Sequence, residues 1–287
     1  MVLKRCMTFC KKNAIGISGF VVASGVVLYE KYKQDNTVLA SWTTGYEPSV
    51  KWDYNWDKRD PQNLIKPKKG QSPELTEKEQ KDLDNEIKKK TPTATRHLLF
   101  IRHGQYNTDG VTDDDRYLTA LGRTQAEFTG LRLKELGFTY SKLISSTMTR
   151  ARETANIVAK SIPEVPREET DILREGAPIP PEPPIGHWLP TKNQFFQDGA
   201  RIEAAFRRYV HRADPDQTED SYEVVVCHAN VIRYFVCRGL QLPPEAWLRL
   251  SLNHGSITWL TIRPSGRVGL RGLGESGFMP AEKISVA

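Results

Sequence analysis

Two short apolar runs in this chain of 287 residues each end in a histidine. The first, RHLLFIR at residues 96–102, leads into His103 and Gly104, and the second, EVVVC at 223–227, leads into His228. Runs of this length that are rich in aliphatic and β-branched residues predict buried strands. Because ligands of open α/β sheets bind beyond the carboxyl ends of the strands, both histidines are expected at one binding site.

Helical patterns alternate with apolar strands along the same region. Thr119 is expected to cap a helix that ends at Gly137, since glycine is favoured just past a helix end. Further elements follow in chain order: a strand around Leu143, helices from Arg150 to Lys160 and from Ala229 to Leu240, and a terminal hairpin or pair of edge strands at 256–262 and 267–273. This alternation predicts an α/β domain of three layers, αβα, with a mostly parallel sheet, over residues 95–287.

The excess of basic residues lies outside the predicted α/β domain. The chain has a net charge of +6, yet residues 91–287 hold 24 Lys and Arg against 23 Asp and Glu. A protein that acts on nucleic acid usually concentrates cations on its working domain, so this balance argues against nucleic acid as a partner. The four cysteines form no CxxC pair and have no histidine at ligand spacing, which indicates neither a disulfide framework nor a zinc site.

The N-terminus is expected to attach the chain to a membrane. Residues 1–12 form a basic leader, and the 17 residues at 13–29 hold no charged side chain. A bilayer core of about 30 Å needs about 20 helical residues, so this run spans it only if flanking lysines extend to the interface or the membrane is thin. A cleaved secretory signal is the alternative, but no A-x-A-like site follows. We therefore expect a membrane anchor at 13–29.

Residues 30–94 are polar and rich in lysine, which is typical of a linker, with a short helix expected from near Ser72. One segment departs from this pattern, because WDYNWD at 52–57 places three aromatic rings among charges. Rings of this size need to be buried against something. The segment either folds back on its own domain or docks on another copy and builds an oligomer, and the residues leave both readings open. The side chains concerned are Trp52, Asp53, Asn55, Trp56 and Asp57.

Four groups of polar residues follow one another at the predicted ends of strands and helices. In chain order they are Arg102-His103-Gly104, Ser145-Ser146 with Arg150, Leu173-Arg174-Glu175-Gly176, and Cys227-His228 with Arg233. One triplet alone is a weak signal, but the ordered set resembles the histidine phosphatase superfamily, the phosphoglycerate mutase-like enzymes, over residues 97–279. The leader, the WDYNWD segment, LREGAPIPPEPP and the ending GFMP resemble the mitochondrial serine/threonine protein phosphatases of that superfamily.

The resemblance implies a phosphoglycerate mutase-like fold and a phosphatase that needs no metal ion and no cofactor. It implies that His103 attacks phosphorus and carries a phosphohistidine, and that Arg102, Arg150 and His228 form the phosphate pocket. Glu175 is implied as the proton donor and then as the base that activates water. Phosphoryl transfer depends on positioning and on neutralising the charge of three oxygens, which the planar fork of arginine does well.

The resemblance also implies a substrate and a location. It points to phosphoserine and phosphothreonine in proteins, with signalling kinases as candidate substrates. It also points to a single-pass position in a mitochondrial membrane, with the outer membrane favoured and the inner membrane as the alternative. The sequence has RHGQY and LREGAP where sugar-phosphate mutases typically have RHGES and an LNERHYG-like segment. A small-molecule phosphatase or mutase, and a scaffold that only binds phosphoproteins, are the alternatives.

Polar residues outside this set are expected to be structural. A histidine at a strand end is often a satisfied, half-buried residue, and a polar residue next to a motif more often supports the site than contacts substrate. On these grounds His97, His187, His211 and His254 are assigned to the fold, and Tyr106, Asn107 and Arg233 to the surroundings of the site.

Overall fold

The structure, a computed structural model, describes residues 49–65, 76–186 and 188–286. The chain divides into two compact units, Met1–Trp52 and Asp53–Ala287. The predicted basic leader and the predicted membrane anchor lie outside the described residues. Within the three described ranges, no helix has the length and the apolar character that a membrane crossing needs.

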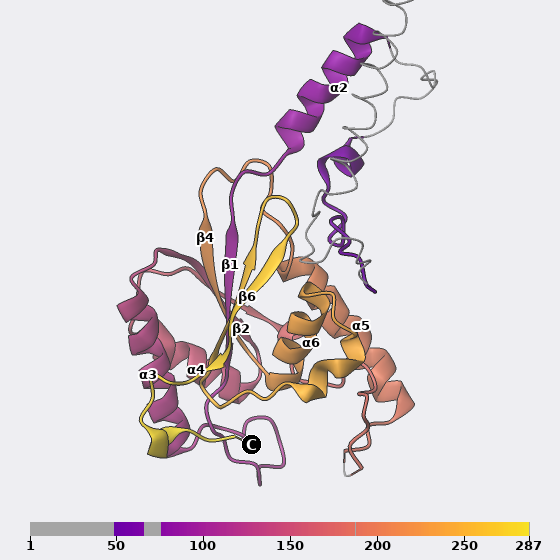
Figure 1. Ribbon diagram of the computed structural model, residues 1–287. Coiled ribbons are helices and arrows are strands. Elements are labelled where there is room, and N and C mark those ends of the chain that lie inside the picture. The colour runs from indigo at the N-terminus through magenta and orange to yellow at the C-terminus, as the bar shows by residue number, and fades with distance from the viewer. Residues whose placement is uncertain (1–48, 66–75, 187, 287) are drawn as a thin grey trace, which may run out of the picture. The chain divides into compact units, whose positions relative to one another are not determined.

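A mixed sheet of six strands forms the centre of the second unit (Figure 1). The strands are β1 (Arg96–Arg102), β2 (Tyr140–Ser146), β3 (Arg167–Thr170), β4 (Ser221–Cys227), β5 (Ile257–Ile262) and β6 (Val268–Glu275). Their order in the sheet is β3-β2-β4-β1-β5-β6. Neighbours from β3 through β1 are parallel, whereas β5 runs antiparallel to β1 and β6 antiparallel to β5. The mostly parallel sheet and the terminal hairpin are thus confirmed.

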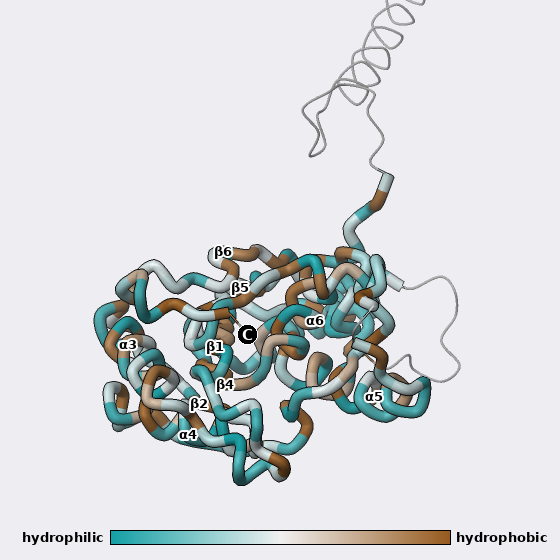
Figure 2. The backbone as a smooth tube through the Cα atoms, turned by 90° about the horizontal axis from the view of Figure 1, so that it is seen from below, coloured by the Kyte–Doolittle hydropathy of each residue, from teal (hydrophilic) through white to brown (hydrophobic). Residues whose placement is uncertain are grey.

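Helices cover both faces of the sheet. The helices α3 (Ala120–Leu136) and α4 (Thr149–Ala159) lie on one face, and α5 (Lys192–Tyr209) and α6 (Ala229–Gly239) lie on the other (Figure 1, Figure 2). This is the predicted arrangement of three layers. The described residues also form α2 (Glu77–Lys90) and the 3-10 helices η1 (Pro61–Leu64), η2 (Asp171–Leu173), η3 (Pro244–Arg249) and η4 (Ala281–Lys283).

The strand β1 is buried along its whole length and contributes to the core on both faces of the sheet. Leu99 and Ile101 belong to the same apolar cluster as Leu133 of α3. The Phe100 ring meets the Phe235 ring of α6 with 5.7 Å between centroids. A fully buried side chain of this size contributes about 1.5–3 kcal/mol. The residues that follow β1 are therefore attached to a firmly held strand.

The helix ends show how local sequence sets the element boundaries. Thr119 Oγ1 accepts from the Gly122 amide N–H at the start of α3, and that helix ends at Gly137, as predicted. The linker helix α2 begins at Glu77, whereas Ser72, near which the sequence predicts a helix start, lies outside the described residues. Thr76 and the Glu79 side chain cap each other's backbone N–H groups there, which fixes the start of the helix.

Candidate active site

The strands β1 and β4 are parallel neighbours, with Arg102 opposite Cys227 in register. The residues that follow these strands therefore lie side by side at the carboxyl edge of the sheet. The His103 amide N–H donates to the Cys227 carbonyl oxygen at 3.1 Å. The ring centroids of His103 and His228 are 5.1 Å apart. The two histidines lie together, as the strand pattern predicts.

The hydrogen bonds of His103 define its tautomer. Nδ1 lies 2.8 Å from the Gly104 carbonyl oxygen, which can only accept, so Nδ1 carries the proton. Nε2 accepts from the Nε–H of Arg150 at 3.2 Å. Burial, followed by the neighbouring His228, Arg150 and Arg102, holds the pKa of His103 well below the usual value for histidine. The imidazole is therefore neutral, with its lone pair on Nε2.

The loop after β1 is clamped by a close approach of two backbones. A Cβ atom at Gly104 would overlap the Gly122 carbonyl group at the start of α3, and a Cβ atom at Gly122 would overlap the Gln105 carbonyl group. The Gly104 N–H also donates to Thr154 Oγ1 of α4 at 3.0 Å. The glycine of the Arg-His-Gly triplet thus lets α3 and α4 hold the backbone of His103 in place.

Two buried guanidinium groups, on different elements, place positive charge near the histidine. Arg102, at the end of β1, donates to the Leu252 carbonyl oxygen at 2.5 Å and to His254 Nε2 at 3.1 Å. Arg150, in the first turn of α4, lies over the Tyr106 ring at 4.7 Å from its centroid. Burial lowers the pKa of Arg102 to about 10, which leaves the group charged at neutral pH.

Several buried nitrogens of this cluster have no hydrogen-bond partner within the described ranges. They are Arg102 Nε, His228 Nδ1, Arg233 Nε and Arg150 Nη1, the last of which has an ion-pair contact of 3.8 Å with Asp113 Oδ1. A buried donor without an acceptor costs about 1–3 kcal/mol. The oxygens of a phosphoryl group are strong acceptors that would satisfy such donors. The cluster therefore suits an oxyanion.

His228 stands at the junction of β4 and α6, as the residue before the first turn of the helix. Its ring is fully buried, and Nε2 lies 2.9 Å from Ser146 Oγ at the end of β2. Burial, followed by the charge of Arg150, lowers the pKa of His228 well below its usual value. Because the Ser146 hydroxyl can donate to Nε2, Nδ1 can carry the proton and donate to an anion beside His103. The amino end of α6 adds partial positive charge to this position.

A separate loop brings Glu175 to the two arginines. Glu175 follows η2, and Arg201 of α5 fixes the loop by donating to the carbonyl oxygens of Ile172 at 3.2 Å and Glu175 at 3.0 Å. Burial raises the pKa of the Glu175 carboxyl group, and the charges of Arg150 and Arg102 oppose that rise. A carboxyl group with a raised pKa keeps its proton to a higher pH than an exposed one and can give that proton up during a reaction.

Tyr106 and His254, which the sequence predicts to be supporting or structural residues, both lie beside His103. The rings of Tyr106 and His254 lie 5.1 and 5.8 Å from that of His103. Their signal in the sequence is slight, since Tyr106 is three residues beyond the histidine and His254 precedes the strand that pairs with β1. His97 stacks on a tyrosine of β4, as expected of a structural residue, and His187 lies outside the described residues.

Positive charge at this cluster comes from arginine side chains. Across the part of the chain that the structure describes, no three His, Cys, Asp or Glu side chains are grouped so that they could hold a metal ion. Arg102, Arg150 and Arg233 are fixed cations of the kind that stabilise a phosphoryl group during transfer.

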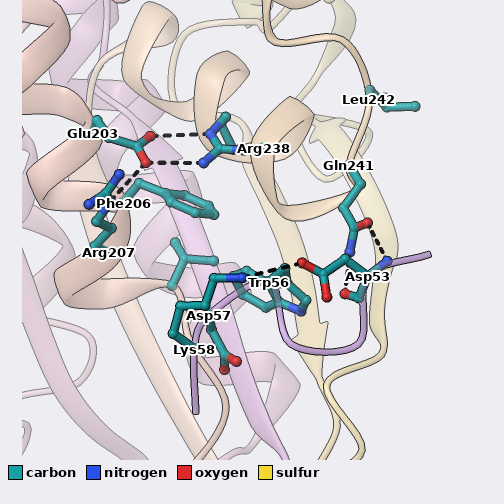
Figure 3. A pocket seen from close by; sticks show the side chains of 11 residues that line it. Asp53, Trp56, Asp57, Lys58, Glu203, Phe206, Arg207, Arg238, Gln241 and Leu242 are labelled. Atoms are coloured by element: carbon teal, nitrogen blue, oxygen red, sulfur yellow. Dashed lines mark hydrogen bonds and ion pairs between the residues drawn. The ribbon is translucent and has the colours of Figure 1, made fainter. Parts of the chain in front are cut away.

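Residues 53–57 of the predicted assembly segment pack against the domain of their own chain in this structure (Figure 3). Trp56 Nε1 donates to the Gly266 carbonyl oxygen at 2.7 Å, and its ring lies 5.8 Å from that of Phe206. Asp57 accepts from Arg212 Nη2 at 2.7 Å, and both side chains are 2% exposed. The contacts of these residues thus correspond to the first of the two readings left open by the sequence.

Asp53 binds the segment to the domain, and Asn55 stabilises the turn that follows. The Asp53 amide N–H donates to Gln241 Oε1 at 2.9 Å, and Asn55 Oδ1 accepts from the Asp60 amide N–H at 3.1 Å. Trp52 is the last residue of the first unit.

Comparison with known proteins identifies the family. The model of the histidine phosphatase superfamily (branch 1) matches residues 98–177 and 183–271. This chain belongs to the histidine phosphatase superfamily. The matched residues of this histidine phosphatase include the whole predicted set, Arg102, His103, Arg150, Glu175 and His228.

Relatives cover most or all of the chain. The Mus musculus protein named "Serine/threonine-protein phosphatase PGAM5, mitochondrial" is 56% identical over 245 residues, which are 85% of this chain and 84% of its own length. The Xenopus laevis protein of the same name is 52% identical over 287 residues, or 99% of each chain. A solved phosphoglycerate mutase from Plasmodium falciparum is 34% identical and covers 63% of this histidine phosphatase and 92% of its own chain, with a TM-score of 0.45.

Proposed function

We propose that this chain is a protein serine/threonine phosphatase that acts through a phosphohistidine at His103. The observation that carries the proposal is the state of His103, a buried neutral imidazole whose Nε2 lone pair faces an arginine. An imidazole in this state is a nucleophile, and the surrounding arginines compensate the charge of a bound phosphate. The name of the relatives, serine/threonine-protein phosphatase, supports the class of substrate.

In the first step, Nε2 of His103 attacks the phosphorus of a phosphoserine or phosphothreonine side chain. The P–N bond forms as the P–O bond to the substrate breaks. Glu175, present as the acid, donates its proton to the departing oxygen, so the hydroxyl group leaves neutral. The N–H groups of Arg102, Arg150 and His228 donate to the phosphoryl oxygens, and Arg150 exchanges its hydrogen bond with His103 for one with the substrate.

In the second step, a water molecule releases the phosphate. Glu175, now ionised, takes a proton from the water as its oxygen attacks phosphorus. The P–N bond breaks, and its electron pair returns to Nε2 of His103. The Gly104 carbonyl oxygen holds the Nδ1 proton throughout, so no other proton of the ring has to move. The products are inorganic phosphate, the free alcohol, neutral His103 and protonated Glu175.

A proline-rich loop near the site favours a protein substrate over a small sugar phosphate. Residues 178–184 are held against η3, because Trp247 Nε1 donates to the Ile179 carbonyl oxygen at 2.9 Å and the Glu182 amide N–H to the Glu245 carbonyl oxygen at 2.9 Å. Proline resists regular secondary structure, so this loop is poorly suited to close as a lid. Competition of a phosphorylated metabolite with phosphopeptide for turnover would instead favour the small-molecule alternative.

A rapid-quench experiment with the full-length chain and a ³²P-labelled phosphoserine peptide tests the mechanism. Wild-type protein is expected to carry acid-labile, base-stable label, and His103→Ala to carry none and to lose turnover. Absence of label on both proteins with equal turnover would show that the mechanism is wrong. Peptide binding by both proteins without turnover would favour the scaffold alternative.

We propose further that the chain is mitochondrial and that residues 13–29 anchor it in the outer membrane, with the inner membrane as the alternative. The relatives are named mitochondrial, which supports the organelle, and the uncharged run behind a basic leader supports the anchor. Digestion of the domain by protease added to intact mitochondria would indicate the outer membrane, and digestion only after rupture of that membrane would indicate the inner one. Equal release by alkaline carbonate of the full chain and of a chain without residues 1–29 would refute the anchor.

We propose that copies of the chain assemble by exchanging the segment at 52–57. An exchanged segment makes in a neighbouring copy the contacts that Trp56 and Asp57 make in their own, so no burial is lost. Residues 58–94 connect the segment to β1 and provide the length for such an exchange. Specific activity is expected to rise with protein concentration, because assembly would favour the ordered state of the domain. Trp56→Ala should lower both the particle mass by light scattering and the turnover of phosphopeptide, and an unchanged particle mass would contradict the exchange.

A further inference from the structure

The last described residues of the chain return to the carboxyl edge of the sheet (Figure 1). The short helix η4 packs against α3, and Ser285 follows it by two residues. The Ser285 carbonyl oxygen accepts from the His254 amide N–H at 2.9 Å. Since the His254 side chain contacts Arg102, the tail is one side chain away from the arginine next to His103.

The tautomer of His254 follows from its two partners. Its Nε2 is 3.1 Å from Arg102 Nη2, and because arginine can only donate, Nε2 is the acceptor. In a neutral ring the proton is then on Nδ1, which lies 2.9 Å from Ser285 Oγ. Burial, with the charge of Arg102 next, lowers the pKa of His254 to about 3, so the ring is neutral at physiological pH. Ser285 Oγ is therefore the acceptor for the Nδ1 proton.

Ser285 also accepts a hydrogen bond from the other side. Gln125 Nε2, on α3, donates to Ser285 Oγ at 2.9 Å and to the Lys283 carbonyl oxygen at 2.8 Å. At the opposite end of the same amide, Gln125 Oε1 accepts from the Gln105 backbone N–H at 2.9 Å. Gln105 lies two residues after His103. Ser285 thus joins two chains of hydrogen bonds that end on either side of the proposed nucleophile.

The backbone next to His254 cannot shift to compensate for a lost partner. Gly255 has a φ of +69°, and its N–H donates to the Arg102 carbonyl oxygen at 3.0 Å. Thr129 Oγ1 donates to the Gly255 carbonyl oxygen at 2.6 Å. A Cβ atom at this position would be strained and would lie 2.9 Å from Met279 Cε. Because hydrogen bonds hold the Gly255 backbone at both its N–H and its carbonyl group, the ring of His254 depends on Ser285 for the protonation of its Nδ1.

We propose that Ser285 is a positioning residue of the phosphate site: its hydroxyl oxygen fixes the tautomer of His254, which in turn holds the Arg102 guanidinium in the orientation that binds phosphate. This role rests on the proposed function of Arg102. Without an acceptor at Nδ1, the imidazole can place its proton on Nε2, towards the N–H of Arg102. Two donors then face each other, and the guanidinium has to turn away.

The test uses the full-length chain with ¹⁵N-labelled histidine. Ser285→Ala removes the acceptor, Ser285→Thr keeps the hydroxyl group, and Lys283→Ala is the matched control, since it alters the same tail but keeps the carbonyl group that Gln125 uses. The ¹⁵N spectrum distinguishes protonated from unprotonated ring nitrogens, and a His254→Gln sample assigns the signals. Calorimetry gives the dissociation constant of inorganic phosphate, and steady-state kinetics give kcat and KM for a phosphoserine peptide.

Ser285→Ala is expected to weaken phosphate binding and lower kcat/KM by about 3- to 10-fold, the effect of one neutral hydrogen bond. Its His254 Nε2 signal should move towards the protonated form, whereas Ser285→Thr and Lys283→Ala should keep the wild-type values. Unchanged phosphate affinity and an unchanged His254 spectrum in Ser285→Ala would overturn the proposal. Equal losses in all three variants, with matching falls in Tm, would also overturn it, because they would indicate general packing of the tail. The spectrum and the calorimetry do not depend on turnover, so a failure of the phosphohistidine mechanism would be distinguishable.

Discussion

Replacing Asp57 by alanine would leave the Arg212 guanidinium buried without its counter-ion. Both side chains are 2% exposed, and Asp57 accepts from the Arg212 backbone N–H at 2.9 Å, from Nε at 3.0 Å and from Nη2 at 2.7 Å. Removing one partner of a buried ion pair costs about 3–5 kcal/mol. In a unit of this size each kcal/mol lowers Tm by about 2–4 °C, so Asp57→Ala is expected to lower Tm by about 6–20 °C.

Scanning calorimetry of the full-length chain measures this difference, with Lys58→Ala as the control. Lys58 pairs with Asp53 at 3.6 Å on the surface, where the two side chains are 76% and 55% exposed, and such pairs contribute about 0–1 kcal/mol. Burial raises the pKa of Asp57, but the hydrogen bonds and charge of Arg212 outweigh it and lower the pKa. The stabilisation is therefore complete above the unfolded pKa of about 3.9 and is lost as pH falls through the folded pKa. Equal Tm values for Asp57→Ala and Lys58→Ala at neutral pH would refute the reasoning.

Three further substitutions test the site. Glu175→Gln should lower kcat by about 10²- to 10⁴-fold in phosphopeptide turnover, the usual contribution of general acid–base catalysis. Wild-type activity should fall as pH rises above the Glu175 pKa, which burial raises, and a pH profile unchanged by the substitution would contradict the role. Arg150→Lys should lower kcat/KM by about 10- to 100-fold, because lysine lacks the planar fork of arginine. Arg152→Lys is the control, since that side chain is 51% exposed, and it should leave kcat/KM unchanged. Equal kcat/KM values for the two variants would count against phosphate binding by Arg150. Gly104→Ala should lower the free energy of unfolding by about 1–3 kcal/mol, because its Cβ atom would overlap the Gly122 carbonyl group. Gly186→Ala is the control, since the space around Gly186 is open, and it should leave Tm unchanged. Equal Tm values for the two variants would argue against the clamped loop.

The parts of the fold that the sequence predicts are those with a local signal of their own. The apolar runs gave β1 and β4, and Thr119 and Gly137 marked both ends of α3. The strand β3 has no apolar run, because REET at 167–170 is an edge strand of the described sheet, next to β2. The helix α5 was missed because its buried side chains lie only in its second half, from Ile202 onwards.

Contacts that link distant parts of the chain explain what the sequence could not predict at the site. Arg102 and His254 are 152 residues apart, and Gln125 and Ser285 are 160 apart. Their contacts exist because β5 pairs with β1 and because the tail returns to α3, and neither event leaves a pattern in the residues concerned. The ordered motifs, in contrast, predicted which residues meet around His103. The anchor and the exchange of the assembly segment stay predictions.

The partners of Arg102 and His103 explain how one set of cations can serve two stages of the reaction. Before phosphate binds, burial, with His228 and the two arginines next, holds the pKa of His103 low, so Nε2 keeps the lone pair that attacks phosphorus in the proposed mechanism. As the P–N bond forms in the proposed first step, positive charge would develop on the ring, and the Gly104 carbonyl oxygen and the phosphoryl oxygens would stabilise it. A carboxylate in place of that carbonyl group would raise the pKa of His103 and favour its protonated form. In the same way, Arg102 donates to a carbonyl oxygen and a neutral imidazole, and neither of these acceptors cancels its positive charge. Glu175 is the carboxyl group whose charge acts on Arg102, and in the proposed mechanism it is protonated when the phosphate binds.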